Sequence, residues 1–183
     1  MFESAGAVVE PIEPFLSEEI FAGLDAFFAA RLLADVDLLP ASRQEAALPF
    51  VIAWCRRARE WTATDALTAL GQIMLMREKT HAVIQPFDFL LTPTSPITAY
   101  DAEQAAPGED PERALPHVGF TAPFNFSEQP AASISAGFDD EGLPIGLQIA
   151  GHRFDDAGVL RMAAVYEAEA GLSGRATDVR DGA

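Results

Sequence analysis

Cysteine and lysine are scarce in this sequence, and both shortages limit the chemistry available to the chain. Cys55 is the only cysteine among 183 residues, so the chain can form no internal disulfide, no CxxC redox pair and no cysteine-based zinc site. A lone cysteine fits a reducing compartment, and we expect a cytoplasmic protein. Lys79 is the only lysine, and it lies in a segment of helical composition.

Long apolar runs and basic clusters are also missing. No stretch approaches the roughly 20 apolar residues that span a bilayer, and Glu3 and Glu10 stand where a signal peptide would carry basic residues. The 12 Lys and Arg against 28 Asp and Glu leave a formal net charge of −16, which repels phosphate backbones and anionic lipids. We therefore expect no nucleic acid and no membrane as partners. The evenly spread acidic residues are interpreted as a solvated surface.

The histidines give no pattern for a metal site. His81, His117 and His152 are far apart in the sequence, and none belongs to an HExxH pair. The GxGxxG spacing that cradles a phosphate is missing too. We expect no metal and no cofactor.

Apolar residues are plentiful, and they suffice for the core of one unit. They make up 49% of the chain, which rules out a disordered tail. We expect one incomplete unit over residues 1–183. It should be helical over 13–85, rich in strands and loops over 86–170, and frayed and polar over 171–183.

The first residues have the pattern of a chain that starts inside a fold. Residues 1–6 are typical of the last turn of a helix with Gly6 as its C-cap, and residues 7–12 (AVVEPI) predict a short strand. A lone helical turn is unstable because helix nucleation is costly. We therefore expect the real domain to begin upstream of Met1.

Helical patterns dominate the first half of the chain. Ser17 is a typical N-cap, and it is followed by two glutamates and by apolar residues at helical spacing. This pattern predicts a helix over 17–35. Further helices are expected over 50–59 and 63–84, the second ending before a proline.

Strand patterns follow in the second half. The compact apolar run at 87–91 predicts a strand, and residues 131–138 and 143–150 flank four polar residues as the two arms of a hairpin. Because these segments are mostly apolar rather than alternating, we expect burial on both faces. The acidic stretch 100–115 predicts an exposed loop, and residues 154–170 predict a closing helix.

Two serines in the predicted hairpin invite a catalytic interpretation. Ser133 and Ser135 would share one face of a strand, and with a histidine they could form a Ser-His-Asp triad. No GxSxG elbow presents either hydroxyl, and small hydroxyl residues in strands usually satisfy backbone groups or permit close packing. We favour the structural interpretation, and we keep a self-sufficient hydrolase as an alternative.

Four segments carry a resemblance to a known family. In chain order they are FDFLLTPTSP (87–96), TAPFNFSEQPAASISAGF (121–138), GLPIGLQIAGHRFDD (142–156) and LRMAAVYE (160–167). Together they resemble the C-terminal part of the amidase-signature family, and the GAVVEP segment near the N-terminus fits what precedes them there. The resemblance implies an α/β fold with part of a mixed central β-sheet covered by helices. It also implies hydrolysis of carboxylic amides through a Ser–cis-Ser–Lys triad.

The same resemblance implies that this triad lies outside the chain. In the family, the lysine and both serines precede the GAVVEP-like strand, and the serines lie in a glycine- and serine-rich loop that also forms the oxyanion hole. Residues 133–137 (SISAG) lack the clustered glycines of such a loop, and Lys79 matches no catalytic position. We therefore expect no catalytic residue here, and a missing N-terminal amidase segment as partner. The alternative is a non-catalytic subunit that completes the pocket or interface of a triad-bearing partner chain, and a homo-oligomer is compatible with either.

Four residues are expected at the pocket for a small-molecule amide substrate. Thr94 and Ser95 follow the end of a predicted buried strand, where open α/β sheets place ligand-contacting loops. Asn125 and Gln129 lie in a segment that the resemblance places near the substrate pocket. A structural role, in stiffening a turn or fixing a loop, is the alternative for all four.

Two further positions bear on the choice of substrate. Glutamine-using members of the family carry an arginine where Ile73 aligns and an aspartate near Val118, and these charges would hold the two ends of the amino acid. Apolar residues at both positions favour a small or hydrophobic amide over free glutamine. Arg77 lies one helical turn further on and is the alternative cation.

Overall fold

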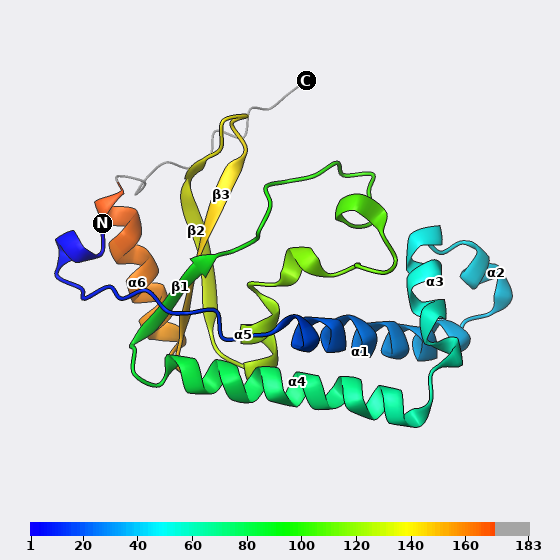
Figure 1. Ribbon diagram of the computed structural model, residues 1–183. Coiled ribbons are helices and arrows are strands. Elements are labelled where there is room, and N and C mark those ends of the chain that lie inside the picture. Colours follow the sequence, from blue (N-terminus) through cyan, green and yellow to red (C-terminus); the bar gives the residue numbers. More distant parts are fainter. Residues whose placement is uncertain (171–183) are drawn as a thin grey trace, which may run out of the picture.

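The computed structural model describes residues 1–170, and the tail expected over 171–183 lies outside the described residues. Two long helices lie side by side, α1 (Glu18–Asp37) and α4 (Ala63–Ile84). A three-stranded sheet stands at one end of this pair, with α6 (Asp156–Glu169) on the side of the sheet away from the pair (Figure 1). The N-terminus lies beside α6 (Figure 1).

Shorter elements complete the fold. The strands are β1 (Phe89–Pro93), β2 (Ala131–Phe138) and β3 (Pro144–Gly151). The short helices are α2 (Ala41–Glu45), α3 (Pro49–Arg56) and α5 (Ala122–Ser127), and 3-10 turns occur at η1 (Glu3–Ala5), η2 (Arg57–Glu60), η3 (Pro107–Glu109) and η4 (Pro116–Val118).

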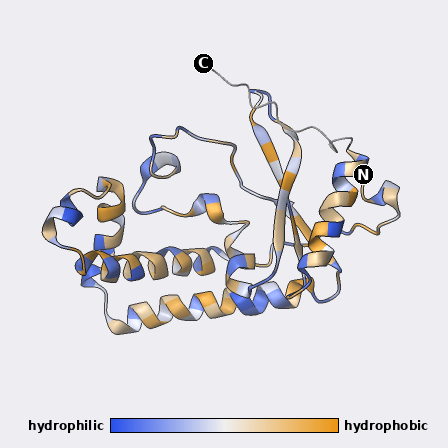
Figure 2. Cartoon of the chain, turned by 180° about the vertical axis from the view of Figure 1, so that it is seen from behind, coloured by the Kyte–Doolittle hydropathy of each residue, from blue (hydrophilic) through white to orange (hydrophobic). Residues whose placement is uncertain are grey.

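The α1–α4 pair is held by a continuous apolar contact. Hydrophobic residues recur along both helices (Figure 2), and Leu24 of α1 packs with Ile73 and Met76 of α4 in one buried cluster. A Cβ built on Gly23 would overlap the side chain of Gln72, so the glycine sets how closely the two helices approach. This pair therefore buries its own contact surface without help from the sheet.

Local signals explain where α4 begins. Thr62 caps the helix by accepting a hydrogen bond from the backbone N–H of Asp65, while the Asp65 carboxylate accepts one from the backbone N–H of Thr62. These two bonds satisfy amides that the helix itself leaves free. The predicted bounds 63–84 are confirmed.

The sheet is antiparallel in the order β1-β3-β2. Leu91 of β1 and Ala132 of β2 both pair with Ile149 of β3, so their side chains point to the same face. That face packs on α6 and on Phe2 from the N-terminal turn. We call it the α6 face.

The opposite face, which we call the α5 face, changes character along the strands. At one end Leu90 and Ala150 pack with Phe124 of α5 and Ile84 of α4. Two residues further along, Thr92, Gln148 and Ser133 are in register and therefore lie on that same face. The α5 face is thus apolar at one end and polar two residues further along each strand.

The hairpin between β2 and β3 forms as predicted. Asp139 begins the turn, and its carboxylate accepts hydrogen bonds from the backbone N–H groups of Glu141 and Leu143. Gly142 has a φ of 83°, a left-handed conformation that favours glycine. Asp139 and Gly142 therefore fix the register of both arms.

Several expectations about local structure need correction. Residues 7–12 form no strand, and the strand expected over 87–91 runs over 89–93. The 7–12 segment has the composition of a strand, but it finds no pairing partner within residues 1–170. Residues 122–127 form the helix α5, which the sequence did not indicate.

Burial on both faces was wrong for β2. Ala131, Ser133 and Ser135 on its α5 face are exposed, whereas Ala132 and Ile134 between them are half-buried. The alternation fits the position of β2 at the edge of the sheet, with one side of the strand packed and the other exposed.

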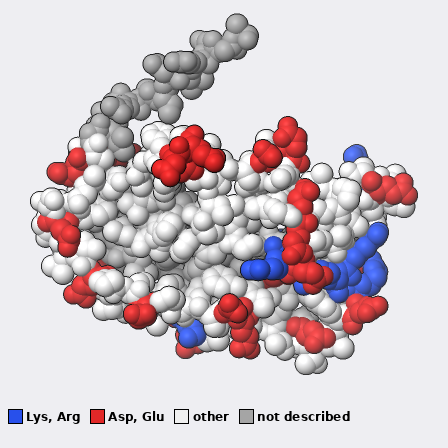
Figure 3. All heavy atoms as spheres, turned by 45° about the horizontal axis from the view of Figure 1, so that its top comes forward, with Lys and Arg blue, Asp and Glu red and all other residues white. Residues whose placement is uncertain are grey.

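Charged side chains are distributed unevenly by sign. Acidic side chains are scattered over the face drawn in Figure 3, while basic ones gather over the end that carries α2, α3 and η2. That end holds Arg43, Arg56, Arg57 and Arg59. None of the helices in residues 1–170 is both long and apolar enough to cross a membrane.

Candidate functional site

A buried amide organises the polar part of the α5 face. The side chain of Gln148 is on β3, and the residue is only 4% exposed. Its Nε2 donates to Thr92 Oγ1 at 2.9 Å and to the carbonyl oxygen of Phe120 at 2.8 Å. Because a buried amide left without partners would be costly, these bonds hold β1, β3 and the segment before α5 in fixed relative positions.

A pair of hydroxyls lies further along the same face. Thr94 Oγ1 and Ser133 Oγ are 2.6 Å apart, and Ser133 is exposed. A Cβ built on Gly146 would stand 2.6 Å from Thr94 Oγ1 and 3.0 Å from Ser133 Oγ, so a side chain at this position would displace the pair. We call Thr92, Thr94, Ser133 and Gln148 the polar strip.

A cavity opens beside the polar strip at the end of β1. Its volume is about 330 Å³, and its walls come from β1 (Leu91 to Pro93), from residues 12–16, and from Phe120 and Pro123. Thr92 supplies a hydroxyl at this wall, while most of the other lining side chains are apolar. We call this the β1 cavity.

The four residues expected at a pocket do not gather in one place. Thr94 joins the polar strip, whereas Ser95 is exposed and its hydroxyl accepts a hydrogen bond from the backbone N–H of Ile97 at 3.3 Å. Asn125 is exposed on α5. None of the four lines the β1 cavity.

Gln129 has both ends of its side chain engaged within the fold. Its Oε1 accepts a hydrogen bond from Ser127 Oγ at 2.6 Å, and its Nε2 donates to the carbonyl oxygen of Gly151 at 2.9 Å. Gln129 thereby ties the end of α5 to the end of β3. The contacts favour the loop-fixing alternative over direct contact with a ligand.

Gln148 was not singled out from the sequence, although one signal was available. Gln148 interrupts the apolar arm LPIGLQIA, and a lone polar residue within such a run indicates a buried group that needs partners. The partners themselves come from segments 28 and 56 residues away. Their identity depends on the folded topology.

The histidines and serines do not assemble into a triad. His152 bonds the carbonyl oxygen of Phe87 at 2.8 Å, and Ser133 bonds Thr94. The pKa of His117 is lowered from its usual range by burial of the ring. Within residues 1–170 no hydrogen bond joins a histidine to Ser133 or Ser135, and no group of three His, Cys, Asp or Glu residues could hold a metal.

An ion cluster connects α4, α5 and the end of β3. Glu128 binds Arg77 through both carboxylate oxygens, Oε1 lying 2.9 Å from Nη1, and it also binds Arg153. Hydrogen bonding to Arg77, with the charge of Arg153, lowers the pKa of Glu128. Glu128 follows α5 with a φ of 60°, which is unusual for a residue other than glycine.

A family model described as Amidase matches residues 3–160. The chain belongs to the amidase family.

Curated proteins similar to this amidase chain share part of its length. One subunit of the Glutamyl-tRNA(Gln) amidotransferase of Myxococcus xanthus (strain DK1622) is 42% identical over 95 residues, which are 52% of this chain and 19% of that protein. The corresponding subunit from Brevibacillus brevis (strain 47 / JCM 6285 / NBRC 100599) is 40% identical over 95 residues, with the same two shares. The chain thus spans about a fifth of the length of these relatives.

Solved structures similar to the chain establish its fold. A bacterial aryl acylamidase of the amidase signature family matches with a TM-score of 0.75 and 23% identity, over 94% of this chain and 38% of that one. 6-aminohexanoate cyclic dimer hydrolase matches with a TM-score of 0.65 and 19% identity, over 91% of this chain and 38% of that one. The resemblance to the amidase-signature family and the α/β fold class are confirmed.

In this amidase chain, the two positions that bear on glutamine lie in one apolar cluster. Ile73 is 2% exposed and packs with Leu24, and Val118 packs against the same group. Arg77, the alternative cation, is held by Glu128. Both positions therefore carry apolar side chains that pack within the fold.

Proposed function

We propose that the chain is the C-terminal part of an amide hydrolase whose reacting groups lie in an amidase segment outside these 183 residues. The main support for this proposal is that the family model matches residues 3–160. The only lysine of the chain, Lys79, is an exposed residue of α4. Amide hydrolysis needs a nucleophile, a proton carrier for the leaving amine and donors for the oxyanion. In this proposal the amidase segment supplies these groups, because Lys79 is the only lysine of the chain and no hydrogen bond joins a histidine to Ser133 or Ser135 within residues 1–170.

The contribution of the chain is a wall of the substrate pocket. The polar strip offers two hydroxyls, Thr94 and Ser133, that can donate to or accept from an amide, and the adjoining β1 cavity offers apolar surface. Asn125 on α5 and Ser95 after β1 are exposed, and we keep both as proposed substrate contacts although neither lines the β1 cavity. Gln129 and Gln148 hold these segments in place.

The exposed side of β2 supports a second segment docked on the sheet. Ser133 and Ser135 face outwards there, and the outer edge of β2 has no strand partner within residues 1–170. An open edge and an uncovered face favour association. The docked segment belongs to the same enzyme or to a triad-bearing partner chain, and in the second case the chain is a non-catalytic subunit.

The substrate in this proposal is a small or hydrophobic amide rather than free glutamine. Ile73 and Val118 offer no charge to the ends of an amino acid, and the bidentate contact with Glu128 occupies the guanidinium of Arg77. A cytoplasmic location is part of the proposal. It is supported by Cys55, which is buried and free, and whose pKa burial raises.

Co-expression with an amidase segment that carries the triad tests the proposal. We expect a soluble complex of defined stoichiometry by sedimentation, and hydrolysis of a hydrophobic amide such as an anilide at a higher kcat/KM than that of glutamine. Thr94→Val should raise KM, because the hydroxyl pair is lost. The control Thr64→Val, at an exposed position of α4, should leave KM and kcat/KM unchanged. A complex that prefers glutamine would overturn the assigned substrate class, and the lack of any complex or turnover would overturn the proposed function.

A further inference from the structure

A bulky side chain is exposed in the turn that leads into α6. The backbone N–H of Asp155 donates to the carbonyl oxygen of His152 at 3.1 Å and closes a four-residue turn. Phe154, the third residue of this turn, has a φ of 69°, a left-handed conformation that glycine or asparagine adopts at lower cost. Burial does not compensate for this cost, because Phe154 is 85% exposed. Within residues 1–170, neither the backbone nor burial favours a phenylalanine at this position.

The ring of Phe154 is nevertheless held in place. The guanidinium of Arg153 lies 5.1 Å from the ring centroid, and Glu128 binds the same guanidinium. A cation–π contact at an exposed site is weak. It orients the ring without covering it, so the ring remains available to a further surface.

Apolar side chains occupy two opposite sides of α6. Ala163 packs on the α6 face of the sheet. The opposite side carries three exposed apolar residues at helical spacing, Ala157, Leu160 and Ala164. We call these three residues, together with Phe154, the α6 strip. Since the outer side of a surface helix is normally polar, the α6 strip has the pattern of a contact surface.

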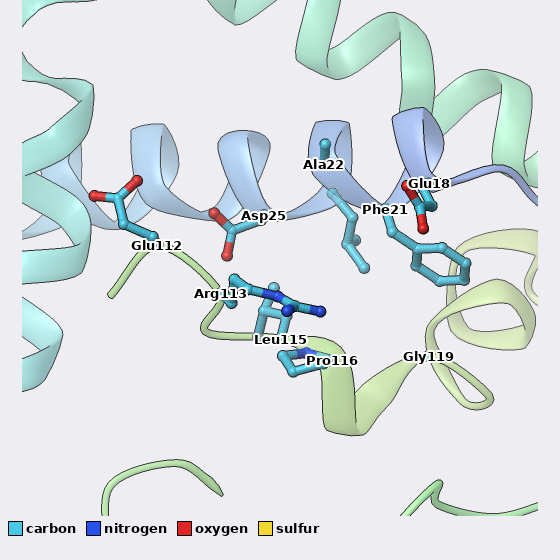
Figure 4. Close-up of a pocket in the computed structure, with 10 residues that line it drawn as sticks. Glu18, Phe21, Ala22, Asp25, Glu112, Arg113, Leu115, Pro116 and Gly119 are labelled. Carbon is cyan, nitrogen blue, oxygen red and sulfur yellow. The ribbon is translucent and has the colours of Figure 1, made fainter. Parts of the chain in front are cut away.

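Neither of the two cavities of the chain lies at the α6 strip. The β1 cavity is lined by β1 and residues 12–16, and a cavity of about 550 Å³ lies between α1 and residues 112–119 (Figure 4). Two carboxylates of the larger cavity, Asp25 and Glu112, are already engaged by Arg57. No residue of α6 lines either cavity. Because small molecules bind in concave sites, the α6 strip suits a protein surface better than a small molecule.

The position of the first residues points to the occupant. Phe2 packs on α6, with its ring centroid 5.5 Å from that of Tyr166, and the N-terminus lies beside α6 (Figure 1). The chain corresponds to only 38% of the bacterial aryl acylamidase, so most of that similar enzyme has no counterpart in these residues. An amidase segment that approaches the chain at residue 1 would start beside the α6 strip.

The charges of α6 disfavour a second copy of this chain as the occupant. Asp155 and Asp156 lie at the start of the helix and Glu167 and Glu169 at its end, while Arg161 is the only base in it. Two α6 helices packed on each other would bring acidic ends together in either direction. The α6 strip therefore suits an apolar surface that is flanked by Lys or Arg.

We propose that the α6 strip binds the amidase segment through an apolar surface flanked by basic residues. The ring of Phe154 is the main contact, and Leu160 packs beside it, while the two alanines allow a close approach. This inference rests on the proposed function, because its partner is the amidase segment proposed there. It adds a second contact surface, on the side of the sheet opposite to the exposed face of β2.

Thermal melting of the full 183-residue chain tests the first step. Phe154→Gly should raise the melting temperature by about 2 °C or more, because it relieves the backbone and removes a ring that is mostly in solvent. Phe154→Ala keeps a Cβ in the left-handed conformation and should melt close to the wild type. A lower melting temperature for Phe154→Gly would show that the ring stabilises the chain itself, and would overturn the inference.

Calorimetric titration with an amidase segment that carries the triad tests the contact. Phe154→Ala should raise the Kd of the complex about thirtyfold or more, and Leu160→Ala about tenfold. The control is Leu67→Ala on α4. Leu67 is 67% exposed and Leu160 is 66% exposed, so the two variants remove the same side chain from equally open helix positions. Only Leu160→Ala should weaken the complex, and an unchanged Kd for both Phe154→Ala and Leu160→Ala would overturn the inference.

Sedimentation of the chain alone tests the other occupant. A dimer of the wild-type chain that Leu160→Ala dissociates, and that Leu67→Ala leaves intact, would assign the α6 strip to a second copy. That result would overturn the inference.

The outcomes separate this inference from the proposed function. If the complex forms through Phe154 and Leu160 but hydrolyses no amide, the α6 contact stands and the proposed function falls. If the complex hydrolyses amides and both variants bind as tightly as the wild type, the α6 contact is wrong and the proposed function stands. A wild-type chain that binds no amidase segment would overturn both.

Discussion

The α1–α4 helix pair and the β2–β3 hairpin complete their packing to different degrees. Leu24 of α1 is 0% exposed and Ile73 of α4 is 2% exposed, because each helix buries the other. Phe138 at the tip of β2 is 69% exposed, and the serines of β2 face outwards. We therefore expect the helix pair to contribute more than the hairpin to the stability of the isolated chain. The exposed surface of the hairpin is available for a further segment or a partner chain to cover.

The largest expected difference between the two regions comes from a pair of alanine substitutions. Leu24→Ala should lower the free energy of unfolding by about 3 kcal/mol, because it leaves a cavity in a closed core. Phe138→Ala should change it by less than about 0.5 kcal/mol, because the ring is mostly in solvent. Chemical denaturation followed by circular dichroism measures both. Similar losses for the two variants would show that the hairpin is as well packed as the helices.

Two glycine substitutions, one in the hairpin and one in α4, extend the comparison to smaller changes in stability. Gly146→Ala should destabilise the chain by about 1–2 kcal/mol, since the added methyl meets Thr94 and Ser133. Gly71→Ala on α4 meets nothing within 4 Å and should stabilise by about 0.5–1 kcal/mol through helix propensity. A melting temperature that Gly146→Ala leaves unchanged or raises would contradict this account of Gly146.

Glu128 tests whether the ion cluster or the backbone dominates at the end of α5. Glu128→Ala keeps a side chain in a left-handed conformation and loses both arginines, so it should be the less stable variant. Glu128→Gly loses the same ion pairs but relieves the backbone, and should melt at a higher temperature than Glu128→Ala. The reverse order would show that the conformation at residue 128 carries no strain.

The smallest effect expected is a pH dependence from His117. Burial lowers its pKa in the folded chain below the ordinary value of 6.5, so the folded state binds fewer protons than the unfolded state just below that pH. The stability from this residue is therefore fully present above pH 6.5 and falls as pH drops towards the folded pKa. His117→Asn should make the melting temperature depend less steeply on pH between about pH 7 and pH 5. An unchanged slope would remove His117 as the cause.

The helices were predictable because their signals are local. Thr62 and Asp65 form a capping box at one end of α4, and Pro86 follows its other end, so the bounds could be read from neighbours in the sequence. The hairpin was predictable for the same reason, since Asp139 and Gly142 define its turn. Helix α5 was missed because its residues (APFNFS) lack a helical apolar pattern, and contact of Phe124 with the sheet and α4 stabilises it.

The site was less predictable because its contacts join distant segments. Thr94 was expected at a pocket, but its contact with Ser133 depends on the register of three strands. The amide of Gln148 meets Phe120 only after the segment before α5 has folded back on β3. The exposed alternation of β2 was hidden by its composition, because alanine and serine suit either a buried or an open face.

Amide turnover by the purified 183-residue chain alone, measured beside its complex with an amidase segment that carries the triad, is the most direct test of the central claim. The account predicts no turnover and no fluorophosphonate labelling of the chain alone, and turnover by the complex that Lys79→Ala leaves near normal. Turnover by the chain alone that is abolished by Ser133→Ala or Ser135→Ala would contradict it, because the reacting groups would then lie within these residues.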